Sequence, residues 1–272
     1  MTLNSEIILR VNELTKSVQL EDKTLALLQP IKLDVISGET LAIVGSSGSG
    51  KTTLLSILAG LDLPSSGEVY LKKHAMHQLN EEQRSQVRAD HVGFIFQQFL
   101  LINSLTALEN VMLPAELAGL DDAEVRGKEL LEQVGLADRI DHYPSQLSGG
   151  EQQRVAIARA FISKPDILFA DEPTGNLDTK TGRHIADLLF KLNEELGTTL
   201  VLVTHDPKLA ARCRRQVEMD SGVLSEKKLS EQKVSEKESS EQSSQSDNKE
   251  PINNPSSDST IVNEVETVSQ VG

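Results

Sequence analysis

The sequence predicts an α/β fold built around a parallel β-sheet, and three observations support this prediction. Short apolar segments alternate with segments of helical spacing along most of the chain. A glycine-rich run, residues 45–52, directly follows the apolar segment 39–44 and precedes a helical segment. Another apolar segment, 167–170, ends in two acids, Asp171 and Glu172. Open α/β sheets bind their ligands at the carboxyl ends of the strands, so we expect the functional site there.

The predicted elements follow one another in the order that builds a parallel sheet. The segments predicted as strands are 39–44, 92–96, 167–170 and 199–203, and those predicted as helices are 51–59, 105–117, 123–134 and 151–162. Gly60 and Pro165 stand where two of these helices should end. Because residues from about 98 to 165 are mostly helical in character, we expect them to form an insert in the sheet core.

Composition and charge narrow the possible classes of protein. A chain of 272 residues is long enough for a substantial buried core. Its net charge of −14 argues against a general nucleic-acid binder, because such proteins are usually basic. The single cysteine, Cys213, cannot form an internal disulfide, which agrees with a cytoplasmic setting. No apolar run approaches the roughly 18 to 20 residues that cross a bilayer, and the first residues lack the pattern of a signal peptide.

The composition changes after residue 224. Residues 225–272 are dominated by Ser, Glu, Lys, Gln and Asn and contain no aromatic residue. Such a segment cannot bury enough apolar surface to offset the entropy lost on ordering. We therefore expect one folded domain over residues 1–224, followed by a disordered acidic tail.

The run 45–52 has the spacing of a phosphate-binding loop: Gly, four residues, then Gly-Lys-Thr. Its glycines let successive backbone N–H groups point at one anion, and the following helix adds the positive end of its dipole. Lys51 supplies a charge for the β- and γ-phosphates of ATP, and the Thr52 hydroxyl suits Mg²⁺. The ATP-binding residues predicted here are Gly45, Ser46, Ser47, Gly48, Ser49, Gly50, Lys51, Thr52 and Thr53.

A further run, residues 147–154, reads Leu-Ser-Gly-Gly-Glu-Gln-Gln-Arg. Ser148 and Glu151 have the spacing of a capping box, which predicts a helix start with an exposed anion site. With the phosphate loop and the acidic strand end, this run resembles the nucleotide-binding cassette of ABC ATPases, as far as about residue 224. The resemblance implies a RecA-like parallel sheet with a phosphate loop, an N-terminal antiparallel β part and a helical insert.

The resemblance also implies roles for the matching acids and glutamine. Asp171 would hold Mg²⁺ together with Thr52, and Glu172 would polarise the water that attacks ATP. Gln97 matches the glutamine of the Q-loop, which touches Mg²⁺ or the attacking water and moves with the insert. Gln98 is the alternative for this position, and Gln97 is preferred because it directly follows Gly-Phe-Ile-Phe.

Other matching residues are expected to act at the nucleotide and between two chains. His205 follows a core strand and matches the histidine that hydrogen-bonds the γ-phosphate. Asp178 belongs to a segment similar to the D-loop, which faces a partner chain. In this family each ATP lies between the phosphate loop of one copy and the residues matching Ser148, Gly149 and Gly150 of a second copy. We therefore expect a head-to-tail homodimer.

Several strings narrow the resemblance within the family. Residues 170–178 and 96–101 resemble the LolD/MacB-type group, and residues 142–144, 147–154 and 210–213 are most similar to YbbA-like ATPases. This likeness implies a peripheral subunit on the cytoplasmic face of the inner membrane, powering a separate permease of FtsX/MacB type. The permease would contact the Q-loop and insert at Phe99, Leu100, Leu101 and Leu105.

Alternatives to a transport ATPase remain. ABC ATPases of translation usually carry two cassettes, and those of chromosome maintenance carry a long coiled coil, whereas this sequence has one cassette and no heptad insert. An ATP-sensing scaffold without hydrolysis should have lost Glu172 or His205, and both are present. An ATPase that transmits force instead of moving a substrate stays open.

One position departs from the wider family pattern. Many ABC ATPases stack the adenine ring on an aromatic residue near the N-terminus, and the matching position here is Val18. The only tyrosines, Tyr70 and Tyr143, lie elsewhere in the sequence. We therefore expect the phosphate and Mg²⁺ contacts to dominate affinity, with weak discrimination between ATP and GTP.

Overall fold

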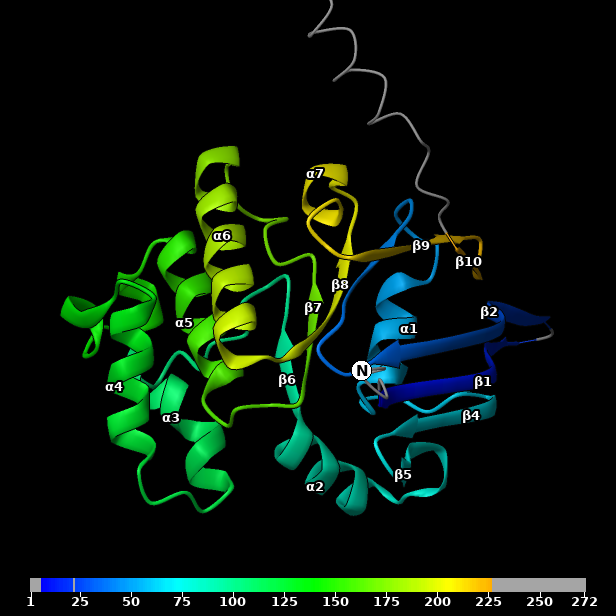
Figure 1. Ribbon diagram of the computed structural model, residues 1–272, viewed down its shortest axis with the longest axis horizontal. Coiled ribbons are helices and arrows are strands. Elements are labelled where there is room, and N and C mark those ends of the chain that lie inside the picture. Colours follow the sequence, from blue (N-terminus) through cyan, green and yellow to red (C-terminus); the bar gives the residue numbers. More distant parts are fainter. Residues whose placement is uncertain (1–5, 22, 227–272) are drawn as a thin grey trace, which may run out of the picture. The chain divides into compact units, whose positions relative to one another are not determined.

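The structure is a computed structural model that describes residues 6–21 and 23–226, which form two β-sheets with helices packed around them (Figure 1). The smaller sheet is antiparallel in the order β2-β1-β4-β5. Its strands are β1 (Ile7–Leu20), β2 (Lys23–Ile36), β4 (Ser66–Leu71) and β5 (His74–Ala75). The larger sheet has the order β10-β9-β3-β8-β7-β6. Its strands are β3 (Thr40–Val44), β6 (Val92–Ile95), β7 (Ile167–Asp171), β8 (Thr199–Thr204), β9 (Arg215–Asp220) and β10 (Val223–Glu226).

The larger sheet is parallel from β9 to β6, and only β10 pairs in the antiparallel sense. The carboxyl ends of β3, β6, β7 and β8 therefore lie along one edge. The segments that follow these four ends carry the phosphate loop, Gln97, Glu172 and His205. The fold thus brings together residues that are far apart in the sequence.

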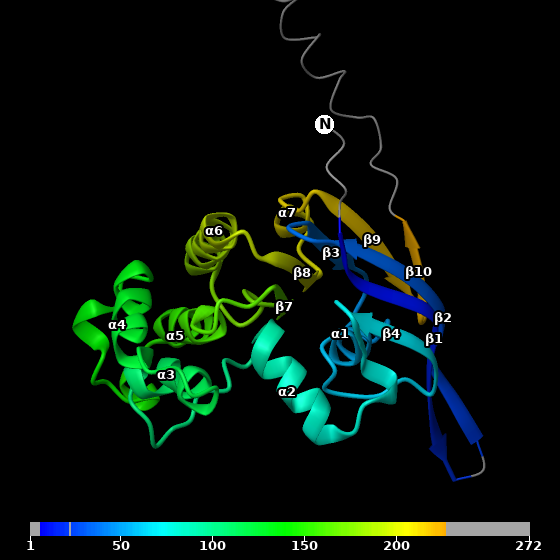
Figure 2. The same cartoon turned by 60° about the horizontal axis from the view of Figure 1, so that its bottom comes forward.

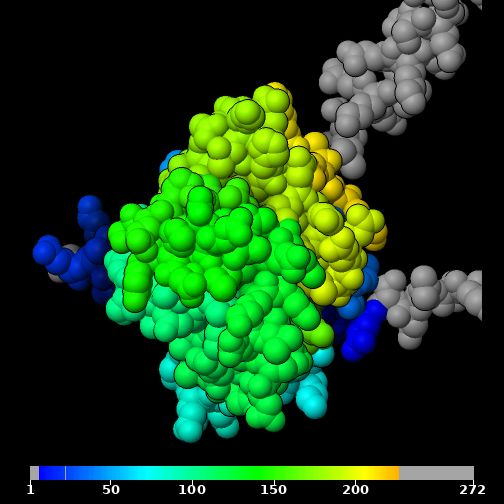
Figure 3. Space-filling view, turned by 90° about the vertical axis from the view of Figure 1, so that its left-hand side faces the viewer, coloured from blue at the N-terminus to red at the C-terminus, as the bar shows by residue number. Residues whose placement is uncertain are grey.

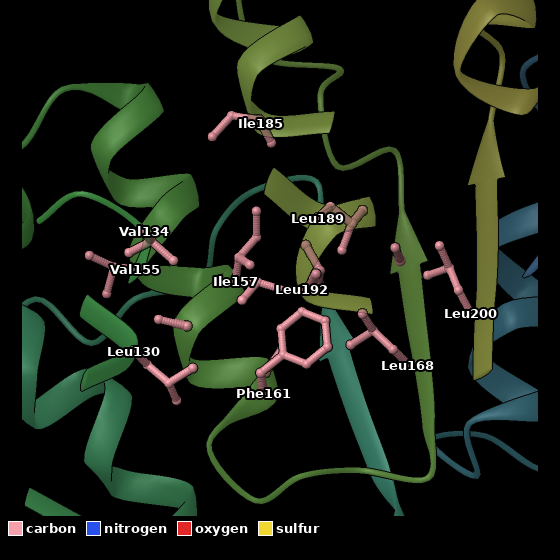
Figure 4. Packing of buried hydrophobic residues seen from close by; sticks show 14 of the residues in the cluster. Leu130, Val134, Val155, Ile157, Phe161, Leu168, Ile185, Leu189, Leu192 and Leu200 are labelled. Atoms are coloured by element: carbon pink, nitrogen blue, oxygen red, sulfur yellow. The ribbon is translucent and has the colours of Figure 1, made fainter. Parts of the chain in front are cut away.

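Both faces of the larger sheet are buried, as expected of a parallel sheet. On one face Leu168, Ala170, Leu200 and Leu202 join a core cluster with residues of α3 to α6. On the other face Ile167, Phe169, Val201 and Val203 join a cluster with α1 and the antiparallel sheet. Figure 4 shows the first cluster, where Phe161 of α5 lies beside Leu168 of β7.

Helices cover both sides of the larger sheet, with α3 to α6 on one side and α1 on the other (Figure 2). The helices are α1 (Lys51–Leu58), α2 (Glu81–His91), α3 (Ala107–Leu117), α4 (Ala123–Gln133), α5 (Gly149–Phe161), α6 (Thr179–Leu196) and α7 (Pro207–Ala210). Among the described helices, polar caps start five, because a side-chain oxygen accepts from a free N–H of the first turn. These caps are Asn80, Thr106, Ser148, Asp178 and Asp206. Helices α3, α4 and α5 form the insert between β6 and β7, and Figure 3 shows that the insert, in green, makes up much of one face.

The predicted α/β class, parallel core, antiparallel β part and helical insert are confirmed. Helix α5 starts two residues earlier than predicted, because its cap is Ser148 and the two glycines already belong to the helix. Strand β10 includes Ser225 and Glu226, the first two residues of the predicted tail. The remainder of that tail, residues 227–272, lies outside the described residues. None of the helices in the described part of the chain is both long and apolar enough to cross a membrane.

Candidate functional site

A pocket of about 790 Å³ opens at the carboxyl edge of the larger sheet. Its walls are the phosphate loop and α1, the segments after β6, β7 and β8, part of β2, and the β9–β10 turn. The lining residues are Leu25, Ala26, Leu27, Ser47, Gly48, Gly50, Lys51, Thr52, Thr53, Gln97, Glu172, Val203, His205, Ser221 and Gly222. Nine of the sequence-predicted site residues are in this lining.

The phosphate loop needs glycine where the chain passes other backbone closely. A Cβ at Gly45 would lie 2.1 Å from the Met219 carbonyl oxygen. Gly50 has a φ of 102° and leads directly into α1, and its Cβ would lie 2.8 Å from a Leu28 methyl group. Lys51 is buried and donates to the carbonyl oxygens of Gly45 at 2.9 Å and Ser46 at 2.7 Å. The loop is therefore closed around its lysine, with the positive end of α1 toward the pocket.

Asp171 provides a buried carboxylate beside this loop. It is 9% exposed, and its Oδ1 has no hydrogen-bond partner among the described residues. Burial raises the pKa of Asp171, although a hydrogen bond from Thr52 and the charge of Lys51 oppose the rise. An unpaired buried carboxylate oxygen next to a hydroxyl is a donor set that suits a hard cation such as Mg²⁺.

Glu172 and His205 form a pair on the pocket wall. Nδ1 of His205 lies 2.9 Å from both Oε1 and Oε2 of Glu172. Because a carboxylate only accepts, the ring N–H donates, and Nε2 remains for another partner. The backbone of Glu172 has a φ of 46°, which is uncommon for a residue with a side chain, and its N–H bonds the Val203 carbonyl at 2.9 Å. Such a conformation often accompanies a functional position.

Gln97 is held in the pocket by the segment after β7. The Asn176 side-chain amide donates to the Gln97 carbonyl oxygen at 2.8 Å, and the Gln97 amide lies 3.5 Å from Asn176 Oδ1. A Cβ on Gly175 would lie 3.2 Å from the Gln97 amide nitrogen. This segment therefore fixes Gln97 next to Glu172.

Ser148, Gly149, Gly150 and Asp178 lie outside the pocket lining. Ser148 caps α5 through the predicted capping box with Glu151, and its hydrogen bond lowers the pKa of that glutamate. Asp178 caps α6, where its carboxylate accepts from Lys180 N and Thr181 N. Asp178 also lines an adjacent hollow that shares Glu172 and His205 with the pocket. A single chain thus does not bring these four residues to the phosphate loop.

Sequence reasoning missed the pocket residues on β2 and on the β9–β10 turn. Leu25, Ala26 and Leu27 read as ordinary strand residues, so nothing in the sequence marked them. Ser221 and Gly222 form the turn that packs on the loop, with Gly222 N–H bonding the Ser49 carbonyl at 3.0 Å. Asn176 stands inside the predicted D-loop segment, and that position was its available signal.

Comparison with known proteins identifies the family to which this chain belongs. Residues 28–175 match the family described as ABC transporter. The chain belongs to this family, as an ATP-binding cassette that hydrolyses ATP. The predicted resemblance is therefore confirmed.

Individual relatives narrow the comparison. The chain is 59% identical over 225 residues to the ABC transporter ATP-binding protein YbbA of Escherichia coli K12, across 82% of this chain and 99% of YbbA. It is 50% identical over 221 residues to the lipoprotein-releasing system ATP-binding protein LolD of Shewanella oneidensis, across 80% of this chain and 96% of LolD. The dimeric cassette MJ0796 bound to ADP and phosphate matches with a TM-score of 0.74 and 41% identity, covering 80% of this chain and 98% of that chain.

Proposed function

We propose that this chain powers a separate FtsX/MacB-type permease at the cytoplasmic face of the inner membrane. Two copies pack head to tail and enclose two ATP molecules. Each ATP is bound by the phosphate loop of one copy and by Ser148, Gly149 and Gly150 of the other. Hydrolysis then reopens the dimer and resets the permease.

The observation that carries this proposal is the separation of two phosphate-binding features. The phosphate loop lines the pocket, whereas the capped N-terminus of α5 does not. Yet that N-terminus has the physical character of an anion site, with free N–H groups and a positive dipole end. A second copy of the chain supplies the anion. The relative MJ0796, which was solved as a dimer bound to ADP and phosphate, supports this arrangement.

Within the pocket, Glu172 acts as the base that polarises the attacking water. His205 holds the Glu172 carboxylate through Nδ1, and its Nε2 donates to the γ-phosphate when the ring carries a second proton. Gln97 lies beside Glu172, where its amide orients the water. Lys51 compensates the negative charge of the phosphates.

Thr52, Asp171 and Gln97 are the residues that would hold Mg²⁺. The Oδ1 of Asp171, which has no hydrogen-bond partner within residues 6–21 and 23–226, fits this role, since a cation would relieve the cost of burying the carboxylate. When bound, the ion neutralises charge on the β- and γ-phosphates.

The substitution Glu172→Gln tests the catalytic assignment and the dimer together. The amide keeps the shape of the side chain but cannot act as a base, so turnover should fall by about 100-fold or more. ATP and Mg²⁺ should still bind, so the closed dimer should accumulate. Size-exclusion chromatography with ATP and Mg²⁺ should give a dimer for this variant and mainly monomer for the parent.

The double variant with Lys51→Ala is the matched control for this experiment. Without Lys51 the nucleotide loses its charge partner, so the double variant should remain a monomer in ATP. Hydrolysis by Glu172→Gln at close to the parental rate would refute the assignment of Glu172.

The segment that begins at Gln97 supports the proposed permease contact. Leu100 and Ile102 are 52% and 42% exposed, whereas Phe99, Leu101 and Leu105 are half-buried. An exposed apolar segment next to a catalytic glutamine is suited to receive the cytoplasmic helix of a membrane partner. The similarity to the lipoprotein-releasing system ATP-binding protein LolD agrees with this partner class.

Co-sedimentation with membranes tests the permease contact. Membranes should contain an FtsX/MacB-type permease from the same genome, and the chain should pellet with them. Leu100→Asp should abolish pelleting, because it places a charge on the apolar segment. Leu20→Asp, at an equally exposed leucine on the β1–β2 hairpin, should pellet as the parent does. Equal pelleting of both variants would exclude residues 99–102 as the contact.

A further inference from the structure

The two ends of the nucleotide pocket differ in chemistry. The polar side chains Ser47, Lys51, Thr52 and Thr53 lie on the phosphate loop and α1, and Gln97, Glu172 and His205 follow the core strands. All of these residues line the end of the pocket at which the proposed function places the phosphates and the hydrolysis reaction. Gly48, Gly50 and Val203 lie on the same elements, and the rest of the lining consists of Leu25, Ala26 and Leu27 on β2 and of Ser221 and Gly222. If the phosphates bind at the first end, the second end is the part of the pocket left for the base.

The second end offers few groups that could distinguish one base from another. Leu25 and Ala26 are exposed, so a flat base can lie on aliphatic carbon. Ser221 provides the one polar side chain there among the described residues, and its hydroxyl already donates to Asp220 at 3.0 Å. A site selects one base strongly only when it carries polar groups that a wrong base would leave unpaired. Contact between a base and aliphatic carbon discriminates weakly.

Leu25, Ala26 and Leu27 form the β2 wall of the pocket, and backbone packing fixes the position of this wall. A Cβ on Gly50 would lie 3.1 Å from the Leu27 carbonyl oxygen, and one on Gly222 would lie 2.6 Å from the same atom. Gln29 N–H bonds the Gly222 carbonyl at 2.9 Å. Strand β2, the phosphate loop and the β9–β10 turn are therefore in mutual contact. Little space remains for this part of β2 to move aside and admit another base-binding group.

We propose that the pocket selects its substrate by the triphosphate and not by the base, so that nucleoside triphosphates as a class are its substrates. This inference rests on the proposed function, because it assumes that the phosphate loop binds the triphosphate. GTP should bind within about tenfold of ATP, a ratio that corresponds to about 1.4 kcal/mol. CTP and UTP should also be bound and hydrolysed, with smaller bases making less contact with the wall.

Competition titration with an ATP analogue that carries its fluorophore on the ribose measures these affinities in the parent protein with Mg²⁺. Phosphate release with each nucleotide is measured in parallel. Ratios within tenfold between ATP and GTP support the proposal, together with measurable hydrolysis of CTP and UTP. A larger preference for ATP, or hydrolysis of ATP alone, would overturn it.

A substitution on β1 tests where the base lies. Val18 pairs with Leu25 across the antiparallel sheet, so the two side chains share a face. Val18→Tyr should therefore add an aromatic surface beside the base and tighten ATP by about fivefold. Gln19→Tyr is the matched control, since this neighbour points to the opposite face and should leave affinity unchanged. Equal effects from both variants would place the base elsewhere and overturn the assignment of the wall.

Failure of this inference can be distinguished from failure of the proposed function. If ATP binds and is hydrolysed but GTP is rejected, the class of substrate is wrong and the catalytic site stands. If Lys51→Ala binds every nucleotide as the parent does, the phosphate loop is not the binding site, and both proposals fail.

Discussion

At the scale of single residues, the buried carboxylate of Asp171 couples function to stability. Burial raises the pKa of Asp171 from its ordinary value near 3.8, so the ionised form is disfavoured in the folded chain. A group with a raised pKa stabilises the fold only while it is protonated. The nucleotide-free protein should therefore lose stability as the pH rises through this raised pKa.

Replacing the carboxylate with an amide removes this cost. We expect Asp171→Asn to raise the free energy of unfolding of the nucleotide-free protein at neutral pH by roughly 1 kcal/mol, the scale of single stabilising changes. The same variant should lose ATP hydrolysis, because it lacks a charge for Mg²⁺. Urea unfolding at neutral and at acidic pH measures the difference, which should shrink as the pH falls. A variant less stable than the parent at neutral pH would contradict this account.

At the scale of elements, α5 braces the segment that follows Gln97. Arg159 donates to the carbonyl oxygens of Phe99 at 2.8 Å and Leu100 at 2.7 Å. Both residues have positive φ, 43° and 49°, so the backbone here is held in an uncommon conformation. Ser148 caps the start of the same helix. One rigid helix thus connects the proposed permease contact with the residues proposed to reach the partner's ATP.

Loss of the Arg159 hydrogen bonds should loosen residues 98–102 without preventing nucleotide binding in the pocket. Arg159→Met retains an unbranched apolar stem but loses both hydrogen bonds, and should destabilise the fold by roughly 1–2 kcal/mol. Hydrogen exchange of residues 98–102 should accelerate, because their uncommon backbone conformation loses its support. Arg159→Lys retains one charged donor and should give an intermediate rate. Unchanged exchange in Arg159→Met would show that the segment is held by other contacts.

The site residues at the ends of the core strands could be predicted from the sequence, whereas the pocket residues on β2 could not. Strands β3, β7 and β8 are short apolar runs, and residues with specific chemistry stand at or directly after the end of each: the phosphate loop, Asp171 with Glu172, and His205. Leu25 and Leu27 are also apolar strand residues, and their place in the pocket depends on β2 lying at the edge of its sheet. Arg159 reads as a polar residue of an amphipathic helix, and its role depends on tertiary packing. Local pattern carries no information about such contacts.

At the scale of the whole molecule, the proposed site needs two chains. Ser148 lies outside the pocket of its own chain, and its hydroxyl bonds Glu151 of the same helix at 2.7 Å. A bulky residue at this position should lose the cap of α5, at a cost of about 1 kcal/mol, but leave the chain folded and its ATP affinity nearly intact while preventing closure onto the partner's nucleotide. Lys51→Ala, in contrast, should damage the pocket of its own chain.

Mixing the two defects tests whether the site is shared. Ser148→Arg and Lys51→Ala should each be inactive alone. A mixed dimer restores one complete site, made of Lys51 from the first chain and Ser148 from the second. In an equal mixture about half of the dimers are mixed, so independent sites should recover about a quarter of the parental ATPase activity. Phosphate release across a series of mixing ratios measures this recovery.

The control places both substitutions in the same chain instead of in separate chains. When Ser148→Arg and Lys51→Ala are placed in one chain and mixed with the parent, every mixed dimer lacks a complete site, so activity should fall below that of diluted parent. If ATPase activity returns when the substitutions are on separate chains and is lost when they share a chain, each site must contain residues of both chains, as in a head-to-tail dimer. If the separate variants regain no activity, although native gels show that they associate, then either the two sites must act together or the composite site is wrong. Binding decides between these: mixed dimers that still trap ATP require coupled sites, and mixed dimers that trap none refute the shared site.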